Sequence, residues 1–247
     1  MILLDFQTLT NPTRVKILNL LYENPQTLKN LNENIDISKP ELSRHLTTMR
    51  DFGLVERSES INNLTTLGQV IVEILSPLDF IIKNFDFFQN HSLQDIPTFL
   101  LRDFDALLDA ERIDGLGYVM KKFEEKFTFQ GEKTYAMMDQ PLGNSSDVRS
   151  KVTKGYYIVP VYAKDENITD DILLASQNQF EIRKLQTVPI GLGKLDDKVG
   201  FLFFADKQGK IDFSTTFYVS NEIGMSFLNK LWSYYWDSAE FYKKYPR

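Results

Sequence analysis

A capped helix followed by a short charged strand constrains the fold of this chain more than any other stretch. Ser38 and Glu41 stand three residues apart with Pro40 between them, which is the pattern of a capping box at a helix start. Gly53 is the residue type that ends a helix in the left-handed conformation. The sequence therefore predicts a helix that begins after Ser38 and ends at Gly53.

Two more helix starts precede this helix, and a hairpin follows it. Asn11 is a capping residue before Pro12 at the first helical position, and Pro25 ends that helix because proline cannot continue its hydrogen-bond ladder. Thr27 can cap a second, shorter helix. After Gly53, the runs LVERS and LTTLG flank the polar tip ESINN. Three short helices and a hairpin predict a winged helix-turn-helix.

The third helix has two faces of different chemistry. At about 100° per residue, Leu42, Leu46 and Met49 share one face, which we expect to pack on the helices before it. The opposite face carries an arginine, which can bond bidentately to guanine, and hydroxyls that reach phosphates or thymine methyl groups. The alternative is an ordinary helix whose polar side meets water. We expect these residues to contact double-stranded DNA: Lys39, Pro40, Ser43, Arg44, Thr47, Thr48, Arg50 and Arg57.

The charge of the chain argues mildly against binding to nucleic acid. The formal net charge is −6, and residues 1–60 hold seven Lys and Arg against eight Asp and Glu. The expected wing tip, SESINN, contains neither Lys nor Arg. Any DNA affinity must therefore come from where the basic side chains point rather than from excess charge.

Composition excludes several kinds of site. The chain has no cysteine, so it can form no disulfide and no thiolate metal site. Its two histidines are expected in unrelated places: His45 half-buried in the third helix, and His91 in a loop between domains. We therefore expect no metal and no cofactor. The sequence shows no bilayer-length apolar run and no signal-peptide pattern, and we expect a cytoplasmic protein without membrane contact.

Motifs for catalysis are also missing from the sequence. There is no G-x-S-x-G, no P-loop and no G-x-G-x-x-G, and no histidine follows His91. The paired carboxylates at 170–171 and 196–197 are expected in loops, where solvated charge is the normal explanation. We expect that the chain is not an enzyme.

The pattern of elements changes after about residue 97. Strand-like runs then alternate with helical ones, which is typical of a sheet covered by helices. Strands are expected at 133–138, 156–162, 181–185, 188–193 and 199–205, and helices at 98–109, 116–126, 145–154, 170–178 and 221–242. The predicted fold class is an α+β winged helix-turn-helix (1–66), joined by a long helical connector (67–97) to an α/β sensor domain (98–247).

Parts of the sequence resemble known regulators. The recognition helix and wing of arsenic-repressor-like winged helices are similar to LSRHLTTMRDFGLVER and the LTTLG after it. Archaeal winged-helix regulators with a C-terminal methanogenesis (filamentation) regulatory domain are similar to FFQNHSLQDIP, VPIGLGKLDDKVGFLFFADKQGKIDFSTTFYVS and FLNKLWSYYWDSAEFYKKY. This resemblance covers nearly the full length. It implies a homodimeric DNA-binding regulator whose C-terminal domain senses a signal.

The connector carries more apolar surface than one contact can cover, which favours a two-fold dimer through it. On the wheel of the last helix, Trp232 and Trp236 lie opposite the expected sheet-facing side, which consists of Ile223, Phe227, Leu231, Tyr234, Ser238 and Phe241. An exposed tryptophan pair would need a partner, or cover from loops of the same domain. The expected dimerisation residues are Val70, Ile74, Leu78, Ile81, Phe85 and Trp236.

A small-molecule effector would need a pocket in the C-terminal domain, where aromatic strands could line one with hydroxyls for orientation. The alternative is that these aromatics are core. The expected lining residues are Tyr118, Arg149, Tyr157, Phe203 and Tyr218.

Together these features favour a signal-responsive, homodimeric transcriptional regulator. The alternatives are a winged helix that binds another protein, or a carboxylate-dependent enzyme in the C-terminal domain.

Overall fold

The computed structural model describes residues 9, 11–127, 131–140, 152–163 and 179–245. The chain divides into two compact units, Met1–Pro77 and Leu78–Arg247, each with its own apolar core. The division falls inside the segment 67–97 that the sequence suggests as a connector. No helix among the described residues is long and apolar enough to cross a membrane.

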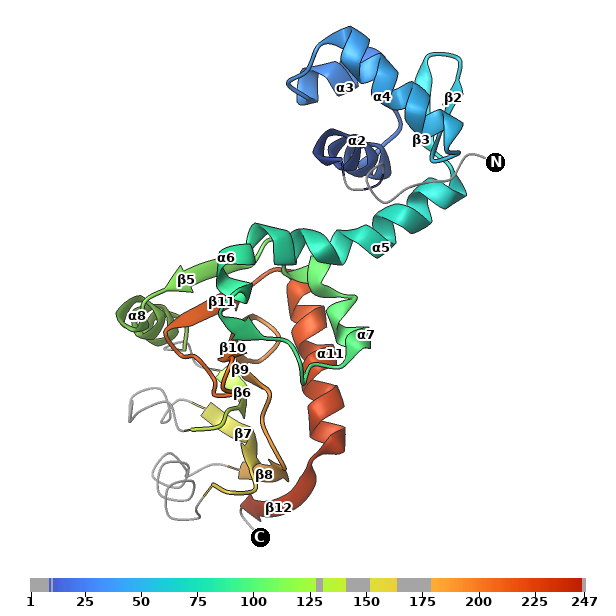
Figure 1. Cartoon of the computed structure of the whole chain (residues 1–247). Coiled ribbons are helices and arrows are strands. Elements are labelled where there is room, and N and C mark those ends of the chain that lie inside the picture. The colour runs from blue at the N-terminus through green and yellow to red at the C-terminus, as the bar shows by residue number, and fades with distance from the viewer. Residues whose placement is uncertain (1–8, 10, 128–130, 141–151, 164–178, 246–247) are drawn as a thin grey trace. The chain divides into compact units, whose positions relative to one another are not determined.

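The first unit is the predicted winged helix-turn-helix, with three helices packed beside a small sheet (Figure 1). Its strands lie in the order β1-β3-β2, all antiparallel. Its elements are α2 (Pro12–Glu23), β1 (Gln26–Thr27), α3 (Leu28–Asn34), α4 (Lys39–Asp51), β2 (Val55–Ser58), β3 (Ile61–Leu64) and the first part of α5 (Thr66–Lys83).

Local chemistry fixes both ends of α4. The Ser38 hydroxyl accepts a hydrogen bond from the Glu41 amide at 3.4 Å, which satisfies one of the amides that a helix start leaves unbonded. Gly53 has a φ of 70°, the left-handed conformation that favours glycine after a helix end. Between them, Leu42, Leu46 and Met49 are buried in the core of the unit, as the helical wheel predicts.

The start of α5 packs closely against the backbone at Leu54, just before the wing. The Thr65 hydroxyl accepts a hydrogen bond from the Gly68 amide at 3.0 Å, which caps the helix. A Cβ atom on Gly68 would lie 2.1 Å from the carbonyl oxygen of Leu54. Only glycine therefore lets the helix approach the backbone this closely.

The second unit is built on a mixed sheet in which nine strands among the described residues take part. The order is β12-β8-β7-β6-β9-β10-β11-β5, and β4 pairs with β10 off this path. The pairs β6–β7 and β7–β8 are parallel and the others are antiparallel. The strands are β4 (His91–Ser92), β5 (Glu111–Asp114), β6 (Gly131–Met137), β7 (Val152–Pro160), β8 (Gln179–Leu185), β9 (Ile190–Leu195), β10 (Val199–Asp206), β11 (Thr215–Val219) and β12 (Glu240–Tyr245).

Helices cover both faces of this sheet (Figure 1). On one face, the long α11 packs over β10, where a Cβ on Gly200 would lie 2.2 Å from Leu228. On the other face, α8 places Phe123 against Phe201, with 5.3 Å between the ring centroids. The helices of this unit are α6 (Phe85–Phe88), α7 (Thr98–Leu101), the 3₁₀ turn η1 (Phe104–Leu107), α8 (Leu116–Phe127) and α11 (Glu222–Ser238).

Several predicted elements differ from the structure. The helix expected at 98–109 is two short pieces, α7 and η1, separated by a turn. The helix expected over 221–242 ends at Ser238, because Ala239 is extended and the chain continues as β12 against β8. Residues 152–154, expected at the end of a helix, belong to β7. The rest of that helix and the one at 170–178 lie outside the described residues.

The face assigned to α11 was wrong in part, since Phe227 and Leu231 are buried as expected but the two ends of the face and the tryptophans are not placed as expected. Trp232 is buried and Trp236 is half-buried, whereas Ile223 is 70 % exposed and Tyr234 is 38 % exposed. The two indoles stack on each other at 5.2 Å between centroids, and Trp232 meets the ring of Tyr135 on β6 edge-on. The tryptophan pair therefore faces the sheet of its own unit.

Candidate nucleic-acid interface

The outward face of α4 is the main candidate surface. Arg44 and Thr47 are exposed on it, and Lys39 and Pro40 are exposed in its first turn. Ser43, Thr48 and Arg50 are half-buried. The residues expected on this face therefore do surround its polar side, opposite the buried leucines.

Two hydrogen bonds within α4 decide which polar groups remain available. The Thr48 hydroxyl donates to the Arg44 carbonyl oxygen at 3.0 Å, so its proton is used inside the helix. Arg50 donates from Nη2 to the Thr47 hydroxyl oxygen at 3.0 Å. The Thr47 proton stays available to a ligand, and the bond holds the Arg50 guanidinium close to the helix surface.

The wing carries a single basic residue in its strands, Arg57. Its Nε donates to the carbonyl oxygen of Glu59 at 3.1 Å, across the hairpin turn. Glu59 has a φ of 55°, the left-handed conformation that the tight turn requires. The guanidinium is thus fixed on the wing tip while keeping other N–H groups for an external acceptor.

His45 connects α4 to α2 rather than pointing outward. Arg14 on α2 donates from Nε to Nδ1 of His45 at 3.4 Å. Burial, followed by the nearby charge of Arg14, lowers the pKa of His45 below its ordinary 6.5. A neutral ring that accepts a hydrogen bond suits a packing role. Its position in sequence indicated the half-burial, but no local signal could have named a partner 31 residues away.

His91 is held in the second unit. Its ring stacks on Phe87 at 3.6 Å, and its nitrogens lie 2.8 Å from the Phe87 carbonyl oxygen and 3.0 Å from Asp212. Within the described parts of the chain, no three or more His, Asp or Glu side chains gather as they would around a metal ion.

The residues expected to line an effector pocket do not come together. Tyr118 is 73 % exposed on α8, while Phe203 and Tyr218 are buried in the core. Tyr157 packs against Phe180 on the β7–β8 pair. Arg149 lies outside the described residues.

The residues expected at a dimer interface divide into two groups. Val70, Ile74 and Leu78 are exposed on α5, and Phe85 is exposed at the start of α6. Ile81 instead packs partly on the core of the second unit. Trp236 lies against the ring of Tyr156 and beneath the guanidinium of Arg183. It was expected in a dimer interface because an exposed tryptophan would need a partner, and these contacts within its own unit remove that argument.

Residues 11–57 match the model of a family described as bacterial regulatory protein, arsR family. These residues run from the cap of α2 to Arg57 in the wing. The N-terminal unit carries an ArsR-type winged helix-turn-helix. The match ends before α5, so it covers no part of the second unit.

One curated relative is also similar over part of the chain. A Methanocaldococcus jannaschii protein described as an uncharacterized HTH-type transcriptional regulator is 38% identical over 50 residues, which are 20% of this chain and 53% of that protein. The chain thus spans about half the length of this curated relative.

Two solved structures are also similar. TrmBL2, an archaeal chromatin protein, is 12% identical with a TM-score of 0.42, and the likeness covers 93% of this chain and 94% of that one. The transcriptional repressor BigR from Xylella fastidiosa is 28% identical with a TM-score of 0.27, over 29% of this chain and 76% of that one. At these TM-scores neither likeness adds weight to the family match.

Proposed function

We propose that this chain is a DNA-binding transcriptional regulator in which α4 enters the major groove. The observation that carries the proposal is the two-sided character of α4. Leu42, Leu46 and Met49 anchor it in the core, while Arg44 and Thr47 are exposed on the opposite side. An arginine on the outer face of such a helix can reach the O6 and N7 atoms of guanine.

The basic residues divide into two roles in this proposal. Arg44, at the centre of the exposed face, contacts a base edge. Lys39 at the start of α4 and Arg57 in the wing contact phosphates, which position the protein without selecting sequence. Ser43, Thr47, Thr48 and Arg50 complete the contact surface, with Pro40 packing against the sugar-phosphate backbone.

We further propose that two copies of this chain form a two-fold dimer through α5. Apolar residues recur along α5 at intervals of three or four, which places them on one stripe of the helix. All are more than 40 % exposed, from Leu78 at 41% to Ile82 at 66%. The stripe consists of Leu67, Val70, Ile74, Leu78 and Ile82, and Phe85 at the start of α6 is also exposed.

A second copy is the occupant that fits this stripe best. A helical stripe of this kind is complementary to itself across a two-fold axis, so one surface supplies both sides of the contact. A two-fold dimer also places two copies of α4 on half-sites about 34 Å apart, or a multiple of that spacing. This arrangement doubles the number of base contacts and so offsets the low basic charge of each unit.

The second unit is proposed to receive the signal that changes DNA affinity. Its mixed sheet, covered on both faces, is a separate compact unit from the DNA-reading one. A ligand that binds this unit differently in the DNA-bound and free forms must change DNA affinity by the same factor.

A mobility-shift assay tests the proposal. The full chain is titrated against the DNA upstream of its own coding sequence and against scrambled DNA of equal length, at two salt concentrations. Selective binding that weakens at the higher salt supports the proposal. A chain that retards neither DNA at the lower salt contradicts it and favours a winged helix that binds protein.

A further inference from the structure

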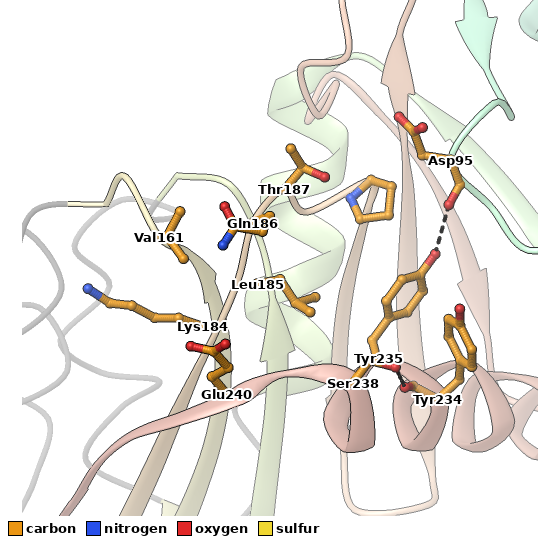
Figure 2. Close-up of a pocket in the computed structure, with 11 residues that line it drawn as sticks. Asp95, Val161, Lys184, Leu185, Gln186, Thr187, Tyr234, Tyr235, Ser238 and Glu240 are labelled. Carbon is orange, nitrogen blue, oxygen red and sulfur yellow. Dashed lines mark hydrogen bonds between the residues drawn. The ribbon is translucent and has the colours of Figure 1, made fainter.

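A pocket of about 390 Å³ lies in the second unit, at the carboxyl ends of the parallel strands β7 and β8 (Figure 2). Val161 directly follows β7, and Gln186 and Thr187 directly follow β8. Ligands of sheets with parallel strands bind outside the carboxyl ends of those strands. The remaining lining residues are Asp95, Lys184, Leu185, Pro189, Tyr234, Tyr235, Ser238 and Glu240.

Two hydroxyl groups of the pocket donate their protons in hydrogen bonds within the protein. The Tyr235 hydroxyl donates to the Asp95 carbonyl oxygen at 3.3 Å, and the Ser238 hydroxyl donates to the Tyr234 carbonyl oxygen at 2.7 Å (Figure 2). A hydroxyl has one proton and two lone pairs, so both oxygens can only accept from a ligand. These two hydroxyl oxygens therefore act as acceptors, whereas Lys184, Gln186 and Thr187 in the same lining carry donor groups.

The formal charges of the pocket favour a cationic ligand. The carboxylates of Asp95 and Glu240 form no ion pair or hydrogen bond with any side chain in the described parts of the chain. The ammonium of Lys184 lies over the Tyr242 ring, 3.9 Å from its centroid. Among the described lining residues, two carboxylates against one lysine leave a formal excess of one negative charge.

Apolar groups complete the pocket. Val161, Leu185 and Pro189 contribute aliphatic surface, and Tyr234 is 38 % exposed. The volume suits a small molecule, because drug-sized ligands occupy pockets of roughly 300–1,000 Å³. A ligand for this site must therefore combine hydrogen-bond donors with an apolar body.

We propose that this pocket binds a small organic cation, a primary amine or a guanidine on an apolar body, and that this cation is the effector of the regulator. The effector role rests on the proposed function, whereas binding to the pocket does not. An ammonium or guanidinium group has only donors to offer, so it suits a pocket with a carboxylate at each end, Asp95 and Glu240 (Figure 2). An anion would meet these two carboxylates against the single ammonium of Lys184.

Calorimetric titration of the full chain with three probes of similar shape tests the site. The probes are 2-phenylethylamine, 2-phenylethanol and 3-phenylpropionate, which are cationic, neutral and anionic at neutral pH. The amine is expected to bind roughly tenfold or more tightly than either of the others, because hydrogen bonds to charged groups are the strong ones. Equal binding of the alcohol and the amine overturns the proposed class of ligand.

Matched variants locate the binding. Glu240→Gln and Asp95→Asn keep the shape of the pocket and each remove one charge, so the variant that removes the partner of the ammonium should weaken amine binding about fivefold or more. Glu124→Gln is the control, because Glu124 is an exposed carboxylate on α8, on the opposite face of the sheet. Binding that is unchanged in both pocket variants, or equally weakened in the control, overturns the assignment.

DNA binding measured with and without saturating amine separates the two parts of the proposal. A change in DNA affinity that is lost in Glu240→Gln supports the effector role. Amine binding with no change in DNA affinity overturns that role. A chain that binds the amine but no DNA contradicts the proposed function while supporting the pocket.

Discussion

The guanidinium of Arg14 donates a hydrogen bond to Nδ1 of His45 at 3.4 Å, and this bond joins α2 to the middle of α4. His45 lies next to Arg44 on the helix proposed to read DNA. The bond requires Nδ1 to be unprotonated, because only a neutral imidazole nitrogen can accept. The protonation of His45 is therefore tied to how α4 is held on the rest of its unit.

We expect His45 to titrate below its ordinary pKa of 6.5, because burial and Arg14 both disfavour the charged ring. In the window between the folded pKa and 6.5, the unfolded chain binds more protons than the folded one. The free energy of unfolding of this unit therefore falls as the pH drops through that window and levels off below it.

Proton NMR can follow this titration, since the chain holds two histidines. The His45→Gln variant assigns the signal. Arg14→Gln should move the His45 pKa upward, because it removes a nearby positive charge and a donor to the neutral ring. Lys16→Gln, at an exposed position on the same helix, should leave it in place. A His45 signal that titrates above 6.5 would show that the contact does not hold in solution.

Arg44→Ala should cost about 1–3 kcal/mol of DNA-binding free energy and relax preference at one base pair, because it removes a base-edge contact. Lys39→Ala should weaken binding to all sequences alike and reduce the salt slope by about one contact. Both effects are measured by mobility shift on operator and scrambled DNA. Lys207→Ala, an exposed cation of the second unit, is the control for net charge. Wild-type operator binding by Arg44→Ala would exclude α4 as the reading helix.

Ile74→Glu should dissociate the proposed dimer, because it places a carboxylate in the middle of the apolar stripe of α5. Light scattering after gel filtration at micromolar concentration measures the mass. Gln69→Glu adds the same charge at an exposed position on the opposite side of the helix and should leave the mass unchanged. A wild-type chain that is monomeric under these conditions refutes the dimer.

Gly68→Ala should destabilise the first unit by about 1–3 kcal/mol, since its Cβ would overlap the Leu54 carbonyl oxygen and force a backbone shift. Gly117→Ala is the matched helical change, because nothing lies within 4 Å of its Cβ. It should stabilise the second unit by about 0.5–1 kcal/mol.

Two optical probes separate these effects in urea titrations. Both tryptophans belong to the second unit, so their fluorescence reports on that unit, whereas circular dichroism reports on the helices of both. Gly68→Ala should shift the dichroism transition and leave the fluorescence transition in place. A shift of the fluorescence transition alone would contradict the packing inferred at Gly68.

The winged helix-turn-helix could be predicted from sequence because its signals are local. Ser38 caps α4 within one turn, Gly53 ends it, and the alternation of buried and exposed positions follows from the helical period. The outward place of Arg44 follows from the same period. The hydrogen bonds that engage Thr48 and Arg57 could not be predicted, because they depend on side-chain rotamers.

The second unit was harder to predict because its structure depends on distant partners. The short strand β5 pairs with β11, about a hundred residues later, and neither strand shows a clear local pattern. Aromatic residues occupy both sides of α11, so the wheel could not decide which side is buried. The sheet decides it, since Tyr135 and Tyr156 meet Trp232 and Trp236.

The wing tip, 58–63, has no lysine or arginine, and Arg57 is bonded to the backbone of the turn. A protein with few phosphate contacts releases few counterions on binding, so its affinity for non-specific DNA is low. A regulator of the proposed kind would find its operator mainly by repeated encounters from solution rather than by sliding along the duplex. It would also leave the chromosome quickly once its operator contacts are lost, which under the proposed function would shorten the delay between a change of signal and a change of transcription.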